Sequence, residues 1–293
     1  MIDTRLITFM TLLEEKNYTN TARRLYITQP AVTHHIKSIE KEMNIILFSN
    51  TKTFELTSAG EVLLEFAKNS VEQHKLLENS LAKAKNELAT SIAFTPFVST
   101  ILENFNITTF FNTLKSKLNV VVDSCDKIFS KLQDGSIDFA IIDDNYNNSD
   151  FSGIPLFTTN IDLVCKVSGK YSNKDKIDVN EFRQANLILT DENSGLYKTI
   201  ITNLSFKNIQ INNETTLKTN NPNWFINLIE CNDGLGFIYH DAAQSYIDRG
   251  RIKKLEFNGF NFTQNIFLIY RKDVHHTKEI ASIIESLRKF LVE

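Results

Sequence analysis

At 293 residues the chain is long enough for two or three ordinary domains, and its 42% hydrophobic and 23% charged residues are typical of a soluble globular protein. No apolar run approaches the roughly 20 residues that cross a bilayer, and the N-terminus lacks the cleavage site of a secretory signal. Three widely spaced cysteines form no CxxC pair, and the net charge is only −3. We therefore expect a cytoplasmic protein with neither a membrane partner nor a disulfide framework.

Residues 1–58 predict a small helical unit with nearly balanced charge, seven Lys/Arg against six Asp/Glu. Apolar side chains recur at helical spacing from residue 5 to residue 15, which predicts a first helix. A second helix is predicted to follow, with Thr19 or Asn20 as its N-cap. Because the net charge is so small, a nucleic-acid surface on this unit would need its positive side chains gathered on one face.

A third helix is predicted to begin after Thr28, whose hydroxyl can cap it. Pro30 falls in its first turn, where a missing N–H costs nothing. Asn44 is the expected C-cap, since Asn tolerates the left-handed conformation found there. Strand-like runs on either side of residues 49–53 predict a small hairpin.

Residues 57–88 predict one long helix. The stretch contains no proline and a single glycine, Gly60, while apolar or small residues recur every three or four positions. At 1.5 Å per residue such a helix is roughly 40 Å long, which is too long for its stripe of apolar side chains to be buried inside a small domain. We therefore expect residues 59–89 to pair with the same helix of a second copy. A long core helix within a single domain is the alternative.

After residue 90, short apolar strands alternate with helical segments, which predicts a mostly parallel α/β sheet. About 200 residues without a visible internal repeat favour two small lobes, lobe I at about 90–161 and 266–293 and lobe II at about 162–265. The predicted helices of this part cover residues 97–105, 126–134, 195–204, 223–231 and 277–291.

A set of motifs at fixed gaps covers residues 17–60, which read NYTNTARRLYITQPAVTHHIKSIEKEMNIILF and, further on, LTSAG. This stretch resembles the winged helix-turn-helix of the LysR-type transcriptional regulators. DGSIDFAII, SGLY and NDGLGFIYHDAAQSYIDRGRIKKL resemble the effector-binding domain of the same family. The resemblance implies a DNA-binding domain at 1–58, a dimerisation helix at 59–89 and a two-lobed α/β effector-binding domain, similar to periplasmic binding proteins, at 90–293.

The resemblance makes the helix after Thr28 the recognition helix. A helix that enters the major groove needs short polar side chains at its first turn. Gln29 can bond an adenine edge in bidentate fashion, and Thr33 offers a hydroxyl and a methyl group one turn on. Arg23 and Arg24 are expected to contact phosphates. The full set of expected DNA-binding residues is Arg23, Arg24, Thr28, Gln29, Pro30, Thr33, His34, Lys37 and Lys52.

Two other interpretations of this helix remain open. An ordinary amphipathic surface helix would show much of the same pattern. A metal site at His34–His35 is the weaker alternative, because adjacent helical residues point about 100° apart whereas metal ligands on one face need a spacing of four. We expect neither a metal nor a cofactor.

In the resembled family a small molecule binds between the two lobes, and α/β sheets generally bind ligands where strands end beside helix N-termini. Thr95 ends a strand just before a predicted helix, and Thr190 and Ser194 lie at a second such junction. An ordinary N-cap is the alternative role for these side chains. The expected effector-binding residues are Thr95, Phe97, Ser99, Asp143, Thr190, Asp191 and Ser194.

Asp143 and Asp144 follow an apolar strand at the end that faces the cleft in the resembled family. A carboxylate at that place would repel a purely anionic effector and favour one with an amine or hydroxyl groups. The bulky ring of Phe97 would narrow the pocket.

No enzyme motif was found: the chain lacks GxGxxG, GxxxxGK[ST], HExxH and GxSxG. The cysteines Cys125, Cys165 and Cys231 are expected to be buried small hydrophobic residues. We therefore expect a sequence-specific regulator that binds double-stranded DNA and an unidentified small molecule, as a homodimer or a homotetramer. A DNA-binding regulator without an effector is the main alternative, and a solute-binding protein is a weaker one.

Overall fold

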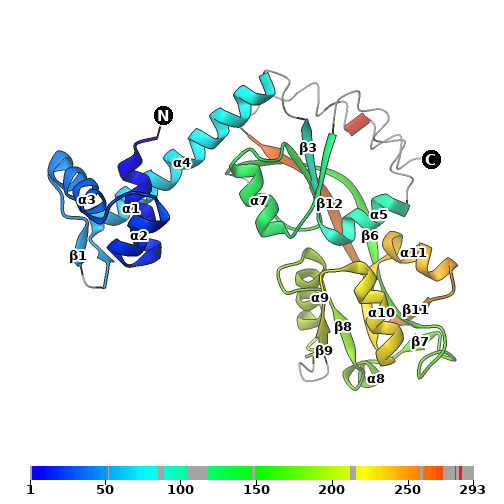
Figure 1. The fold of residues 1–293 in the computed structure, drawn as a ribbon. Helices are drawn as coiled ribbons and strands as arrows, with labels where there is room; N and C mark the ends of the chain where they lie inside the picture. The colour runs from blue at the N-terminus through cyan, green and yellow to red at the C-terminus, as the bar shows by residue number, and fades with distance from the viewer. Residues whose placement is uncertain are drawn as a thin grey trace. The chain divides into compact units, whose positions relative to one another are not determined.

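The computed structural model describes residues 2–51, 53–84, 89–104, 118–146, 149–211, 216–257, 260–272, 281 and 284–285. The chain forms two compact units, Met1–Glu87 and Leu88–Glu293 (Figure 1). Each unit has a hydrophobic core of its own, so each is described by itself.

Unit 1 is a helical bundle with a short hairpin. Its elements are α1 (Thr4–Glu15), α2 (Tyr18–Arg24), α3 (Gln29–Met43), β1 (Phe48–Asn50), β2 (Glu55–Leu56) and α4 (Ser58–Ala84). Apolar side chains of α1, α3 and α4, among them Phe9, Ile36 and Leu63, pack into one core. The antiparallel pairing of β1 with β2 confirms the predicted hairpin.

The N-cap of α2 is Asn17, two residues before the earlier of the predicted caps. Its side-chain oxygen accepts hydrogen bonds from the backbone N–H groups of Thr19 (2.8 Å) and Asn20 (3.0 Å). The prediction of Thr19 or Asn20 was wrong because both residues lie inside the first turn, where their own N–H groups need the cap.

Both ends of α3 confirm the prediction. The Thr28 hydroxyl accepts a hydrogen bond from the N–H of Ala31 (3.3 Å), and Pro30 lies in the first turn. Asn44 ends the helix with a left-handed φ of 52°, and its N–H donates to the carbonyl of Glu40. The direction in which the first turn of α3 projects is thus set by local capping.

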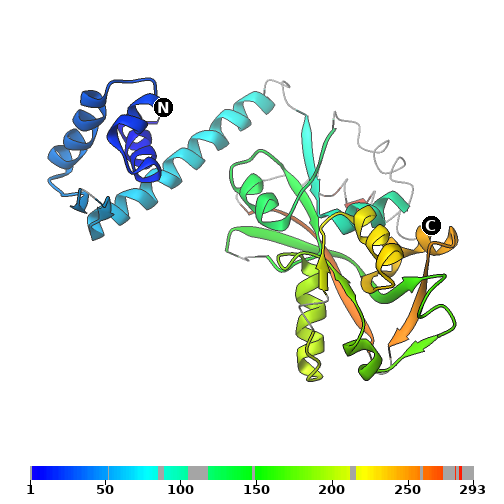
Figure 2. The same ribbon diagram turned by 60° about the horizontal axis from the view of Figure 1, so that its bottom comes forward.

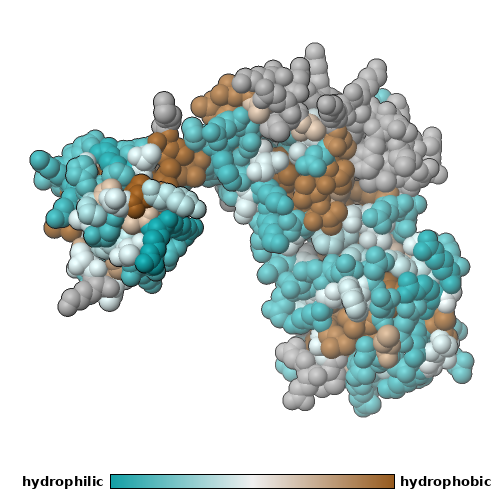
Figure 3. Space-filling view, viewed as in Figure 1, coloured by the Kyte–Doolittle hydropathy of each residue, from teal (hydrophilic) through white to brown (hydrophobic). Residues whose placement is uncertain are grey.

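The helix α4 is 27 residues long and only partly covered within unit 1. Leu63 and Ala67 are buried against the core of this unit. Apolar surface is visible over α4 in Figure 3. The side chains of α4 that are more than half exposed although they are apolar are Val62, Phe66, Leu77 and Leu81.

Unit 2 is a mixed sheet flanked by helices (Figure 2). Its strands are β3 (Thr90–Phe94), β4 (Leu118–Val122), β5 (Phe139–Ile142), β6 (Phe151–Lys166), β7 (Lys176–Ile177), β8 (Leu187–Leu189), β9 (Thr216–Lys218), β10 (Leu235–Tyr239), β11 (Ile252–Phe257) and β12 (Phe262–Arg271). Its helices are α5 (Pro96–Asn104), α7 (Cys125–Gln133), α8 (Val179–Arg183), α9 (Gly195–Phe206), α10 (Pro222–Asn232) and α11 (His240–Asp248).

The long strands β6 and β12 join the two lobes. They pair antiparallel from Ile161–Phe262 to Phe151–Arg271, and the sheet order is β4-β3-β5-β12-β6-β10-β8-β9. The three strands β4, β3 and β5 of lobe I are parallel, as are β10, β8 and β9 of lobe II. The expectation of a mostly parallel sheet was wrong at its centre, because the chain passes between the lobes in opposite directions. The predicted helix over 277–291 lies almost wholly outside the described residues.

Candidate nucleic-acid interface and effector cleft

The N-terminal end of α3 presents a polar surface. Thr28, Gln29 and Pro30 are exposed, whereas the opposite face of the helix is buried in the core of unit 1. The amide of Gln29 donates to the hydroxyl of Thr33 (3.1 Å), so two expected base-reading groups lie side by side. Lys37 is exposed one turn further along the same face.

The two neighbouring arginines of α2 differ in their surroundings. Arg24 forms ion pairs of 2.8 Å with Glu14 and Glu15, and these bonds raise the pKa of its guanidinium. A phosphate would therefore have to compete with two carboxylates for Arg24. Arg23 is exposed, which leaves it the better placed of the two for a phosphate. Lys52, the expected contact from the hairpin, lies outside the described residues.

His34 and His35 point in different directions. Their ring centroids are 6.5 Å apart, and Nδ1 of His35 is hydrogen-bonded to the hydroxyl of Thr8 on α1 (2.9 Å). His34 is exposed beside the first turn of α3. Over the described residues no group of three His, Cys, Asp or Glu side chains could hold a metal ion.

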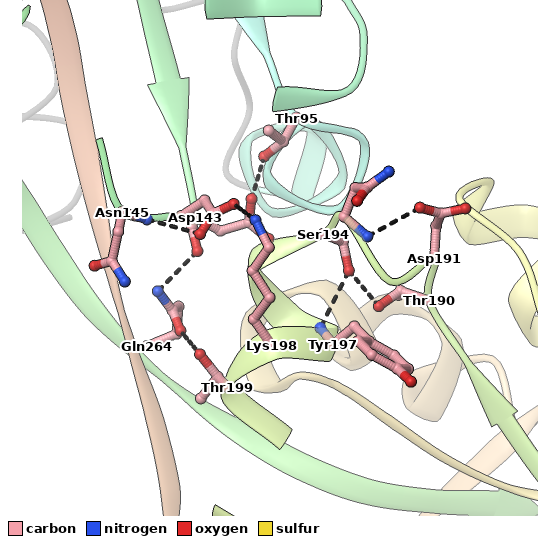
Figure 4. Close-up of polar contacts among 12 residues, drawn as sticks. Thr95, Asp143, Asn145, Thr190, Asp191, Ser194, Tyr197, Lys198, Thr199 and Gln264 are labelled. Atoms are coloured by element: carbon pink, nitrogen blue, oxygen red, sulfur yellow. Dashed lines mark hydrogen bonds and ion pairs between the residues drawn. The ribbon is translucent and has the colours of Figure 1, made fainter. Parts of the chain in front are cut away.

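In unit 2, Asp143 is buried between the lobes, and each oxygen of its carboxylate accepts a hydrogen bond. Figure 4 shows the bond from Thr95. Its Oδ1 accepts from the hydroxyl of Thr95 (2.8 Å), and its Oδ2 accepts from the hydroxyl of Tyr239 (2.7 Å). Burial raises the pKa of the Asp143 carboxyl, against the opposing effect of these two bonds. Thr95 and Asp143 thus come together as expected, but they bind each other.

Helix α9 of lobe II lies directly against the end of β5. A Cβ on Gly195 would overlap the carbonyl group of Asp143, so only glycine allows this approach. Lys198, one turn along α9, forms an ion pair with the buried carboxylate of Asp144. The amide of Gln264 on β12 donates to the carbonyl oxygen of Asp143 (2.8 Å).

The remaining expected effector residues serve the local backbone. Ser194 is the N-cap of α9: its hydroxyl accepts from the N–H of Tyr197 (3.1 Å) and lies 2.5 Å from the hydroxyl of Thr190. Asp191 accepts from the N–H of Asn193 (3.0 Å). The hydroxyl of Ser99 donates to the carbonyl of Pro96 in its own helix (2.7 Å). Of these side chains, Ser194 has the N-cap role that was left open as the alternative, while Asp191 and Ser99 bond to nearby backbone groups.

The aromatic ring of Phe97 also closes the cleft. It is buried and meets Phe225 of α10 edge to face, with ring centroids 5.5 Å apart. The cavity beside it holds about 20 Å³ and is lined by Thr95, Pro96, Phe97, Ser124, Cys125, Asp143, Asn193, Ser194 and Asn220. That is room for about one water molecule, whereas pockets for metabolites span roughly 300–1,000 Å³. In this conformation the lobes are closed on each other.

Sequence reasoning missed four residues that hold this closure: Gly195, Lys198, Tyr239 and Gln264. Lys198 follows the predicted Ser194 by one helical turn, a spacing that could have identified it. Tyr239 and Gln264 could not have been found from sequence, because they reach the site from distant strands.

The two buried cysteines are not activated thiols. Burial raises the pKa of Cys125, beside the cleft, and raises that of Cys165 to about 11. Cys231 is exposed, contrary to the expectation that all three are buried. A thiol whose pKa is raised by burial is protonated at neutral pH and reacts slowly with oxidants.

Comparison with protein-family models gave two matches. Residues 4–61 match the bacterial regulatory helix-turn-helix protein of the lysR family, and residues 114–291 match the LysR substrate binding domain. None of the helices in the described ranges is long and apolar enough to cross a membrane.

Similar proteins are known regulators. The chain is 25% identical over 195 residues to the HTH-type transcriptional regulator YtlI of Bacillus subtilis, a match that covers 64% of the chain and 61% of YtlI. It is 22% identical to CysL of the same organism, over 97% of the chain and 95% of CysL. Among solved structures, CbnR in complex with its target DNA matches 99% of the chain and all of CbnR, with 17% identity and a TM-score of 0.63. OxyR of Corynebacterium glutamicum matches 99% of the chain and 91% of OxyR, with 20% identity and a TM-score of 0.60.

Replacing Gly195 by alanine should destabilise unit 2. The new methyl group meets backbone atoms of Asp143, which cannot move aside without shifting α9 from β5. We expect a loss of about 1–3 kcal/mol and a fall of several degrees in Tm, measured by thermal unfolding of the full chain. Gly169→Ala is the matched control, since the atoms nearest to its methyl group would be side-chain atoms of Asp233 and Lys166. Equal Tm values for the two variants would contradict the tight contact.

Proposed function

Because the chain belongs to the LysR family of transcriptional regulators, we propose that α3 reads the DNA sequence, that α4 joins two copies, and that the lobes of unit 2 respond to a small molecule. The chain is a LysR-type DNA-binding regulator with an effector-binding domain, and not an enzyme. The proposed domains are 1–58 for DNA binding, 59–89 for dimerisation and 90–293 for the effector.

The exposed first turn of α3 is the observation that supports the DNA-binding proposal. Gln29 and Thr33 are polar and adjacent, and Thr28 caps the helix end that would enter the major groove. Arg23 is available for a phosphate at the groove edge, while Arg24 would first have to leave its two carboxylates. His34 and Lys37 extend the same polar surface. Specificity would come from α3, and general affinity from the cations around it.

The apolar surface of unit 1 supports the dimer proposal. A groove of about 510 Å³ lies between the start of α1, the end of α3 and α4, and Phe66 and Leu77 of α4 line it. Both side chains are more than half exposed. Exposed apolar side chains next to an unfilled groove are typical of a surface that binds another chain. A second copy would place two α3 helices on a site of two-fold symmetry, and two such dimers would form the tetramer.

The closed lobes constrain any effector. An effector must separate α9 from the end of β5. It can do so only if the free energy gained from its own contacts exceeds the free energy of the contacts that it breaks. A ligand with an amine could take the place of the Lys198 ammonium on Asp144. This supports the amine-bearing class, through Asp144, whose present partner is an ammonium group, rather than through Asp143, whose present partners are two hydroxyl groups. The cavity of only about 20 Å³ favours the alternative, a regulator whose lobes stay closed and bind no effector.

Gln29→Ala should weaken binding to a specific site by about 1–3 kcal/mol while leaving binding to random duplex DNA nearly unchanged. Arg23→Ala should weaken both equally and lower the slope of log K against log salt by about one. Fluorescence anisotropy at several salt concentrations, with a duplex selected from a random library and an unselected duplex, measures both. Equal losses for Gln29→Ala on the two duplexes would contradict its role.

Phe66→Glu should weaken self-association by about 100-fold or more, because a charge would replace a large apolar side chain at the centre of the contact. Sedimentation equilibrium of the full chain measures the change. Lys68→Glu is the control: Lys68 is exposed two residues along α4 and so points about 200° around the helix from Phe66. If Phe66→Glu associates as tightly as the wild type, α4 is not the dimer contact.

A thermal-shift screen of the full chain tests the effector. Amino acids, dicarboxylic acids and sugar acids should be compared, and a ligand at 100 times its Kd stabilises by about 2.7 kcal/mol. We expect amine-bearing ligands to raise Tm and simple dicarboxylates not to do so. Lys198→Ala should alter the response to the amine if the ligand reaches Asp144. No shift across the panel would favour the effector-free alternative.

A further inference from the structure

Tyr26 lies in the turn between α2 and α3 with an unusual conformation. Its φ is 55°, in the left-handed region, and its side chain is 96% exposed. This backbone conformation is costly for a bulky residue, and glycine or asparagine is usual where a turn requires it. An aromatic ring in water gains nothing from burial to offset that cost.

Among the described residues, the others with a left-handed backbone have a compensation that Tyr26 lacks. Phe54, with φ 56°, packs its ring against Tyr18 and Phe48 at centroid distances of 5.7 and 5.8 Å. Lys16 keeps its charged side chain in water, where it is favoured. The remaining non-glycine examples, Asn44, Asn208 and Asp233, are residue types that tolerate this region. Strain without local compensation points to a function for the side chain.

The position of Tyr26 indicates what its side chain would contact. It stands two residues before the N-cap Thr28 and three before Gln29, at the end of α3 that would enter the groove. Its N–H donates to the carbonyl of Arg23 (3.2 Å), which holds the turn beside that exposed cation. On the proposed DNA complex, this place corresponds to the edge of the groove, where phosphates and sugars lie.

We propose that Tyr26 contacts the DNA backbone at the edge of the groove, with its hydroxyl donating to a phosphate and its ring packed on the adjacent sugar. This inference rests on the proposed role of α3. Because phosphates and sugars are the same at every position, the contact adds affinity and fixes the register of α3 without reading sequence. Because the tyrosine is neutral in this contact, it releases no counterion and leaves the salt dependence unchanged.

The test compares Tyr26→Asn with the wild type in the full chain. Because asparagine tolerates the left-handed turn, the Tm should be unchanged or higher. The DNA affinity should fall about tenfold on both a library-selected duplex and an unselected 30-base-pair duplex. The salt slope should stay at the wild-type value, unlike that of Arg23→Ala. Tyr26→Phe should lose only the part of the affinity due to the hydroxyl. Anisotropy titrations and thermal unfolding measure these quantities.

Phe206→Asn is the matched control, because Phe206 is an exposed aromatic residue (81%) of unit 2 and its replacement should leave DNA affinity unchanged. If the wild type itself does not bind DNA, the proposed function fails. If the wild type binds and Tyr26→Asn binds equally well, only the role of Tyr26 is overturned. A Tm that falls together with the affinity would also overturn it, since Tyr26 would then stabilise the fold.

Discussion

The buried carboxyl group of Asp143 is the constraint around which unit 2 closes. A carboxyl group without access to water needs hydrogen-bond donors from the protein. Thr95 of lobe I supplies one and Tyr239 of lobe II supplies the other. Because the donors come from both lobes, moving the lobes apart would break the hydrogen bond between Tyr239 and Asp143. The same bonds that satisfy Asp143 therefore hold the lobes together beside a cavity of about 20 Å³.

The closed arrangement of the lobes determines what an effector would have to do to regulate the protein. An effector can shift the equilibrium between the closed and open arrangements only by its difference in affinity for the two. The closed arrangement is already stabilised by the Lys198–Asp144 ion pair and by the close packing of Gly195 on Asp143. A ligand that replaces those contacts with its own would open the cleft at low net cost. If no ligand opens the lobes, control would have to come from the amount of protein or from its assembly.

Much of unit 1 could be predicted because its signals are local. The apolar spacing of the helices, the cap at Thr28 and the C-cap at Asn44 each depend on residues within one or two turns. The error at the start of α2 was also local: two capping residue types, Thr19 and Asn20, follow the true cap Asn17, and sequence does not rank them. In unit 2 the strands were largely found, but the antiparallel pairing of β6 with β12 joins residues about 100 positions apart.

By itself, the sequence determined the class of protein, the order of its domains and the polar face of α3, because motif spacing and helical periodicity are properties of neighbouring residues. It also placed Thr95, Asp143 and Thr190 at strand ends and Ser194 just before a helix, where the structure has them. Only the tertiary structure decided that these side chains bond one another instead of lining an open pocket. The reason is that hydrogen-bond partners and close packing depend on which distant strands and helices meet, and no local pattern encodes that meeting.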